Sequence, residues 1–151
     1  MIKHIKGDIF KSNADAILHQ VNCQGVMGSG IAKQVKESFP VVFEYYKSWC
    51  DNPSLKPGLL GQIQIVYTDN TGRQAIINLF AQDKFGYNGC YTDYDALKKC
   101  LEKVNKQFAG KKIAIPYLMS CNRGGGNWSV VYEIIKNTLT DCDVTLYEYN
   151  K

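Results

Sequence analysis

The sequence predicts an α/β protein, a three-layer α/β/α sandwich in which helices cover both faces of a mixed, mostly parallel sheet of six strands. Apolar runs of strand length alternate with helical patterns from end to end, in the order β-β-α-α-β-β-α-β-α-β. Two glycine-rich segments each join an apolar run to a helical pattern. At 151 residues, with no internal repeat or low-complexity stretch, the chain is expected to form a single domain over residues 1–151.

The first fifty residues predict two strands and two helices. Residues 1–6 and 14–22 are apolar runs of strand length. Apolar side chains recur at i, i+4 and i+8 over residues 31–39, which predicts a helix that ends at Pro40. A second helix is expected over residues 41–49.

The rest of the chain predicts four more strands and two helices. Residues 62–67 and 74–80 form strands around a hairpin turn at 69–72. Thr92, followed three residues later by an aspartate, resembles a helix cap and predicts a helix to about Phe108. The remaining elements are a buried strand at 112–116, a helix at 130–139 and a closing strand at 143–149.

Composition and charge favour a protein of the cytoplasm. The formal net charge is only +4, and the lysines alternate with acids along several elements, so direct nucleic-acid binding is the weaker interpretation. The six cysteines form no CxxC pair and show no metal-ligand spacing with the two histidines, which indicates reduced thiols and no metal site. No signal-peptide pattern or apolar run of membrane length is present, so no membrane partner is expected, and the protein is expected to be a monomer.

The glycine-rich segments, residues 21–32 and 120–128, carry the functional signal. Glycine lets a backbone approach a ligand closely, and the free N–H groups at a helix start attract anions. The order G-x-x-G-x-G in the first segment differs from the dinucleotide fingerprint, and the sequence contains no P-loop motif, so a P-loop enzyme is excluded. Either loop alone could be a tight turn, but two at the same expected sheet edge predict a diphosphate-containing nucleotide ligand.

Five segments in the same order resemble the macro domains that bind ADP-ribose. They are Lys6–Phe10, Val21–Ala32, Asn78–Gln82, Tyr91–Leu97 and Pro116–Trp128. The resemblance covers essentially the whole chain and is greatest to the branch that processes ADP-ribose-1″-phosphate or hydrolyses terminal ADP-ribose. It implies the sandwich fold, an ADP-ribose ligand and no cofactor or metal.

The resemblance also implies where each part of ADP-ribose binds. Asp8 would accept a hydrogen bond from the adenine amino group, Ile9 would cover the adenine, and Tyr149 or Tyr147 would pack against it. Asn22 would bond the terminal ribose. One phosphate would meet the N–H groups of Gly28, Ser29, Gly30 and Ile31. The second loop would enclose the diphosphate and terminal ribose with Ser120, Cys121, Asn122, Arg123, Gly124, Gly125, Gly126 and Asn127.

Departures from the family pattern leave the chemistry open. Ser120 and Asn122 replace glycines, and Asn127 replaces an acid that relatives carry. Ester-cleaving relatives use a lysine shortly after the fourth strand, where this chain has Gln82, Asp83 and Lys84. The catalytic candidates are therefore Asn22, Gln82, Asp83 and Lys84, whereas Cys23 and Cys121 are interpreted as packing residues and not as nucleophiles.

Two functions remain open. The first is hydrolysis at the C1″ end of ADP-ribose, either of an ester or glycosidic linkage or of a 1″-phosphate. The second is a non-catalytic reader or sequestering module. The expected partner is ADP-ribose or an ADP-ribosylated macromolecule, with nucleic acid only as a modified substrate.

Overall fold

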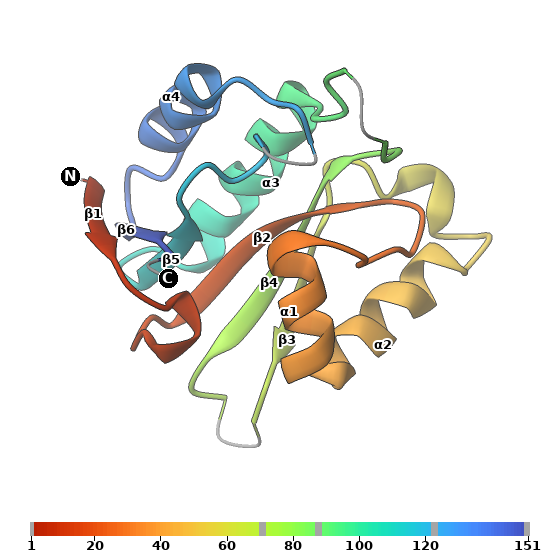
Figure 1. The fold of residues 1–151 in the computed structure, drawn as a ribbon, viewed down its shortest axis with the longest axis horizontal. Helices are drawn as coiled ribbons and strands as arrows, with labels where there is room; N and C mark the ends of the chain where they lie inside the picture. Colours follow the sequence, from red (N-terminus) through yellow and green to blue (C-terminus); the bar gives the residue numbers. More distant parts are fainter. Residues whose placement is uncertain (1, 70–71, 87–88, 122–123, 150–151) are drawn as a thin grey trace.

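The computed structural model describes residues 2–69, 72–86, 89–121 and 124–149. Its strands are β1 (Ile2–Lys6), β2 (Ala16–Asn22), β3 (Ile63–Tyr67), β4 (Ala75–Gln82), β5 (Lys112–Pro116) and β6 (Asp143–Glu148). Its helices are α1 (Gly30–Ser38), α2 (Pro40–Cys50), α3 (Tyr94–Gln107) and α4 (Trp128–Thr138), and single 3₁₀ turns lie at Ile9–Lys11 and Lys56–Gly58. The predicted order of strands and helices is confirmed (Figure 1).

The six strands form one sheet in the order β1-β6-β5-β2-β4-β3. Every pairing is parallel except that between β3 and β4, which form the predicted hairpin. Two residues of the hairpin turn predicted at 69–72, residues 70 and 71, lie outside the described ranges. The mixed, mostly parallel sheet is therefore as predicted, and the carboxyl ends of β1, β6, β5, β2 and β4 share one edge.

Helices cover both faces of the sheet (Figure 1). On one face α3 and α4 bury an apolar cluster that includes Leu97, Val104 and Ile135. On the other face α1 and α2 bury a second cluster with Val35 and Val42. The central strands contact both clusters, which explains why their sequences are nearly continuous apolar runs.

Short polar side chains begin two of the helices. Asp93, and not Thr92, caps α3, because its carboxylate accepts a hydrogen bond from the Ala96 N–H at 2.9 Å. The cap predicted at Thr92 is therefore wrong by one residue. Asn127 caps α4 by accepting from the Ser129 N–H at 2.9 Å.

The six cysteines are free thiols. In the described ranges no three His, Cys, Asp or Glu side chains are grouped so that they could hold a metal ion. None of the helices described is both long and apolar enough to cross a bilayer.

A row of buried polar side chains crosses the face that α1 and α2 cover. His19 Nε2 lies 2.5 Å from the amide oxygen of Asn78, whose nitrogen donates to Gln64 at 2.9 Å. The His19 Nδ1 atom has no hydrogen-bond partner among the described residues. Complete burial lowers the pKa of His19 from 6.5 to about 4, although the bond to Asn78 acts in the opposite direction. The imidazole is therefore neutral in the folded protein near pH 7.

We expect His19 to make the fold sensitive to acid. His19 takes up a proton near pH 6.5 in the unfolded chain and only near pH 4 in the folded chain. Its contribution to stability is therefore complete above pH 6.5 and is lost as the pH falls from 6.5 to 4. The difference corresponds to about 3 kcal/mol of unfolding free energy. Urea unfolding at pH 7 and pH 4.5 should show that His19→Gln loses less unfolding free energy between the two pH values than the wild type does. The control His4→Gln, at the exposed histidine, should behave as wild type, and an equal loss in all three proteins would contradict the assignment.

Candidate functional site

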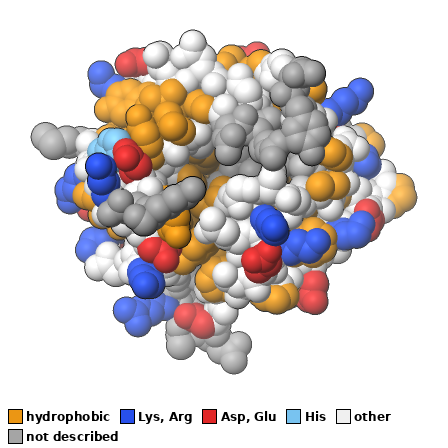
Figure 2. Space-filling view, in the orientation of Figure 1, with side chains coloured by type: hydrophobic (Ala, Val, Ile, Leu, Met, Phe, Trp, Pro, Cys, Tyr) orange, Lys and Arg blue, Asp and Glu red, His pale blue; other side chains and the backbone are white. Residues whose placement is uncertain are grey.

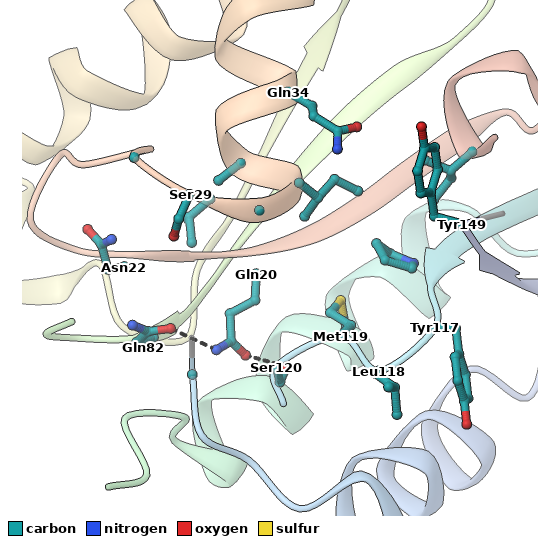
Figure 3. Close-up of a pocket in the computed structure, with 18 of the residues that line it drawn as sticks. Gln20, Asn22, Ser29, Gln34, Gln82, Tyr117, Leu118, Met119, Ser120 and Tyr149 are labelled. Atoms are coloured by element: carbon teal, nitrogen blue, oxygen red, sulfur yellow. Dashed lines mark hydrogen bonds between the residues drawn. The ribbon is translucent and has the colours of Figure 1, made fainter. Parts of the chain in front are cut away.

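A cavity of about 500 Å³ opens at the carboxyl ends of all five parallel strands. Its walls come from the ends of these strands and the segments that follow them: residues 7–9 after β1, residues 20–22, 26, 28–32 and 34 with and after β2, residues 82, 85 and 86 with and after β4, residues 116–120 and 124 with and after β5, and residues 147 and 149 with and after β6. Asn22 and Gln82 lie at one end, here called the amide end, and Tyr149 lies at the other (Figure 3). Ligands of open α/β sheets bind at this edge.

The first glycine-rich loop, in which a phosphate site is predicted, lines the cavity. Gly28, Ser29, Gly30 and Ile31 all contribute to the wall. The Ser29 side chain makes no cap bond to α1, so the N–H groups of the first helical turn are left for a ligand. A Cβ at Gly28 would meet only the Val26 side chain at 3.6 Å. The bare backbone at Gly28 therefore faces open space and not packed protein.

Asn22 is held in place by bonds within its own loop. Its amide oxygen accepts from the Gln24 N–H at 2.9 Å, and its nitrogen donates to the Val26 carbonyl at 2.9 Å. The Tyr46 hydroxyl lies 2.8 Å from both the main-chain and the side-chain oxygen of Asn22, and it accepts from the Val26 N–H. Burial raises the pKa of the Tyr46 phenol, with Cys50 adding to the effect, so its hydroxyl keeps its proton. Toward the cavity Asn22 thus presents its second N–H.

Asp8 lies near Tyr149, away from the amide end. The two residues are close because the Gly7 N–H donates to the main-chain carbonyl of Glu148 at 2.9 Å and joins the ends of β1 and β6. One oxygen of Asp8 accepts from the Phe10 N–H at 2.9 Å, and the other is not used by this cap. Ile9 and Tyr149 line the cavity beside it, and Tyr149 is 65% exposed. Tyr147 packs against the apolar cluster on the α1 and α2 face while also lining the cavity.

The second glycine-rich loop lines the cavity only in part. Ser120 and Gly124 belong to the wall. The cavity wall does not include Cys121, Gly125, Gly126 or Asn127. The predictions for Asn122 and Arg123 concern residues outside the described ranges.

Packing explains the glycines that face away from the cavity. A Cβ at Gly125 would clash with the Gly89 carbonyl oxygen, and the Gly125 φ of +66° is in the left-handed region. The Gly124 carbonyl accepts from the N–H groups of Tyr91 and Thr92 at 2.7 and 3.0 Å. The loop is therefore pressed against the segment that precedes α3.

A chain of neutral side chains forms the wall at the amide end. Gln20 donates to Gln82 at 3.0 Å and to the Thr92 hydroxyl at 2.9 Å, and it accepts from the Ser120 hydroxyl (Figure 3). Gln82 in turn donates to the Lys84 carbonyl at 2.7 Å. The side chains of this series are all buried or half-buried, and none of their buried polar atoms lacks a hydrogen-bond partner.

Asp83 and Lys84 are exposed and do not line the cavity. The Asp83 main-chain oxygen accepts from the Cys23 N–H at 3.0 Å, and its side chain accepts from Gln24 at 3.2 Å. The next residues, Phe85 and Gly86, do line it. The two charged catalytic candidates therefore lie beside the amide end, and the neutral Gln82 occupies its wall.

The cysteines near the cavity are not activated. Burial, followed by the neighbouring Asp83 carboxylate, raises the pKa of Cys23 to about 12. Burial also raises the pKa of Cys121. Neither side chain lines the cavity, so the interpretation of both as packing residues agrees with their positions.

Sequence reasoning missed several residues of the site. Gln20, Gln34, Phe85, Tyr117 and Met119 line the cavity without having been predicted. Gln20 carried a usable signal, because it lies two positions before Asn22 and therefore on the same face of a largely buried strand. Tyr46 gave no such signal, since an aromatic residue on a helix face is normally a core residue.

Charge is sparse in the cavity. Asp8 is the single charged side chain that lines it among the described residues. Figure 2 shows Lys and Arg side chains interspersed with Asp and Glu on this face and not gathered in a basic stripe. An anion bound here would meet backbone N–H groups and amides instead of ammonium groups.

Known proteins share this fold and part of the sequence. The macro domain family matches residues 18–135. The DNA ADP-ribosyl glycohydrolase of Mycobacterium tuberculosis is 28% identical over 97% of this chain and 42% of its own length. The ADP-ribose 1″-phosphate phosphatase of Meyerozyma guilliermondii is 35% identical over 56% of this chain and 55% of its own length. The solved macrodomain of Mycobacterium tuberculosis DarG superposes with a TM-score of 0.78 at 25% identity, covering 100% of this chain and 98% of that one.

The chain belongs to the macro domain family. The resemblance noted in the sequence is thereby confirmed, together with the α/β sandwich that it implied. The chain spans 42% of the glycohydrolase and 55% of the phosphatase, so each relative contains further sequence that has no counterpart in this match.

We expect the two classes of glycine to respond differently to substitution. Gly125→Ala places a Cβ against the Gly89 carbonyl at a positive φ, and we expect a loss of about 2 kcal/mol or more of unfolding free energy. Gly28→Ala adds a methyl group to open space and should change stability by less than about 0.5 kcal/mol. Thermal and urea unfolding of both variants provide the measurement. Equal stability of the two would show that the second loop does not need its glycine for packing.

Proposed function

We propose that this macro domain binds ADP-ribose and hydrolyses bonds at its C1″ end, acting on an ADP-ribosyl ester or glycosidic linkage or on a 1″-phosphate. The observation that carries the proposal is the cavity itself, since one pocket places a carboxylate at one end, uncapped helix N–H groups in the middle and two amides at the other. Its volume lies in the range of sites for small ligands, about 300–1,000 Å³. The activities for which the two relatives are named support the same substrate class.

The ligand would lie along the cavity with adenine beside Asp8 and Tyr149. The free oxygen of Asp8 suits the adenine amino group, while Ile9 and Tyr149 supply apolar surface. The diphosphate would meet the N–H groups of residues 28–31 on one side and the loop at 120–124 on the other. The terminal ribose would then reach Asn22, which turns an N–H toward it.

Hydrolysis would take place at the amide end. There Asn22 and Gln82 would orient the ribose and its substituent, and bound groups would position the attacking water. Asp83 and Lys84 remain candidates for acid–base help, because they follow Gln82 directly, although a change in their loop would be needed to bring them to the ligand.

A non-catalytic reader is the second candidate. It is favoured by the neutral Gln82 in the wall where ester-cleaving relatives are expected to carry a lysine, since an amide cannot act as an acid or base.

As further parts of the proposal, the chain works as a single domain and a monomer in the cytoplasm. Its partner is ADP-ribose or an ADP-ribosylated macromolecule, with nucleic acid bound only where it is modified. The interspersed surface charge supports that last point.

Titration calorimetry with ADP-ribose, ADP and NAD tests the proposal, and we expect selective binding of ADP-ribose. Asp8→Asn keeps the oxygen that caps Phe10 but turns a donor toward adenine, so affinity should fall about five- to a hundredfold at unchanged stability. Release of free ADP-ribose from 1″-phosphate and ester substrates then separates the hydrolase from the reader. Absence of binding would refute both functions.

Tyr46→Phe should weaken the binding of ADP-ribose more than that of ADP. The lost hydroxyl holds Asn22 and the Val26 N–H, so the defect is confined to the terminal-ribose end. Stability should fall by about 1–2 kcal/mol because buried partners lose a bond. The control Tyr45→Phe, on the exposed face of the same helix, should alter neither property. Equal weakening of both ligands would mean that Tyr46 has only a general structural role.

A further inference from the structure

The register of the two central strands brings Asn22 and Gln82 side by side. β2 and β4 pair in regular steps up to Val21 and Phe80, and the next pair skips one residue, so that Asn22 is opposite Gln82. Such irregularities re-aim side chains and are common beside functional sites. The two amides thus share the amide end of the cavity (Figure 3).

Backbone carbonyls determine which way the Gln82 amide points. The Thr92 hydroxyl donates to the carbonyls of Ser120 and Gly124, 2.9 and 3.2 Å away, so toward Gln20 it can only accept. Gln20 must therefore turn its nitrogen to Thr92, while its oxygen accepts from the Ser120 hydroxyl.

The same nitrogen of Gln20 faces Gln82, which leaves Gln82 to present its oxygen there. The Gln82 nitrogen then donates one N–H to the Lys84 carbonyl, and no described group takes the other. The orientation of the Gln82 amide thus follows from the backbone carbonyls of Ser120 and Gly124, where this series of hydrogen bonds begins. It does not depend on how the amide oxygen and nitrogen were assigned.

Asn22 is oriented in the same sense by a separate set of bonds. Its oxygen accepts from the Gln24 N–H and lies beside the Tyr46 hydroxyl, and its nitrogen keeps one N–H after donating to Val26. The amide end therefore offers two uncharged N–H donors, while both amide oxygens face internal donors.

We propose that Gln82 determines specificity for the group attached at C1″, selecting substituents whose atoms next to C1″ accept hydrogen bonds, with Gln20 and Thr92 as positioning residues. Suitable substituents have carbonyl or phosphoryl oxygens. A substituent that carries only N–H donors, such as a guanidinium, leaves the N–H of Gln82 unpaired and opposed by like donors. The inference rests on the proposed function, because it assumes that C1″ lies at the amide end.

Calorimetry with two hydrolysis-resistant ADP-ribose analogues tests the inference. One carries a C-linked ketone at C1″ and the other a guanidino group joined to C1″ through a methylene carbon, with ADP as the reference ligand. The wild type should prefer the ketone. Gln82→Met removes the donor at similar volume and should reduce that preference about three- to tenfold, with the affinity for ADP unchanged. Because methionine and glutamine are both uncharged, any preference due to the charge of the guanidino group is the same in both proteins.

Thr92 offers a matched pair for the positioning role. Thr92→Val removes the hydroxyl that orients Gln20 and should lower the ketone preference, whereas Thr92→Ser keeps the hydroxyl and should restore it. A purely structural role would lower the affinity for ADP and both analogues together. An unchanged preference in Gln82→Met overturns the inference, while failure of the wild type to bind ADP-ribose or ADP overturns the proposed function instead.

Discussion

The hydrogen-bonded pairing of β2 with β4 is the constraint on which the pocket depends. β4 is buried along its whole length and β2 along nearly all of it, so their backbone groups can be satisfied only by neighbouring strands. A shift by one residue would turn apolar side chains toward the wrong layer, which holds the register in place. Because the register is fixed, the loops that follow β2 and β4 begin at fixed positions relative to each other. The single skipped residue before Gln82 is what brings that side chain beside Asn22.

The two glycine-rich loops look alike in sequence but meet different physical demands. Gly28 in the first loop faces the cavity with almost nothing near it, so its small size leaves space there and is not required by packing. Gly125 in the second loop is pressed against the Gly89 carbonyl, so its small size serves the fold. The second loop needs this contact to hold Ser120 and Gly124 against Thr92, which in turn orients the amide end.

Local patterns predicted the elements, whereas long-range hydrogen bonds decided the details of the site. The strand at 112–116 was predicted to the residue because a buried apolar run lies between lysines and a proline. Thr92 and Asp93 are both good helix caps, and only the contact of Thr92 with the Ser120 carbonyl, 28 residues away, leaves the cap to Asp93. The partner of Gln20, Ser120, lies 100 residues away, a separation at which one sequence carries no pairing signal.

Ser120 and Gln82, two departures from the family pattern, are coupled through one hydrogen-bond partner, Gln20. Both bond to Gln20, and its nitrogen faces position 82, so an ammonium group there would meet a donor and lose hydration in a buried wall. A serine at 120 and a glutamine at 82 satisfy the same amide without charge. Neutral N–H donors polarise a bound oxygen but cannot protonate a departing group. The hydrolysis proposed for this end would therefore favour groups that leave as stabilised anions, such as phosphate or carboxylate, over groups that must be protonated before they leave.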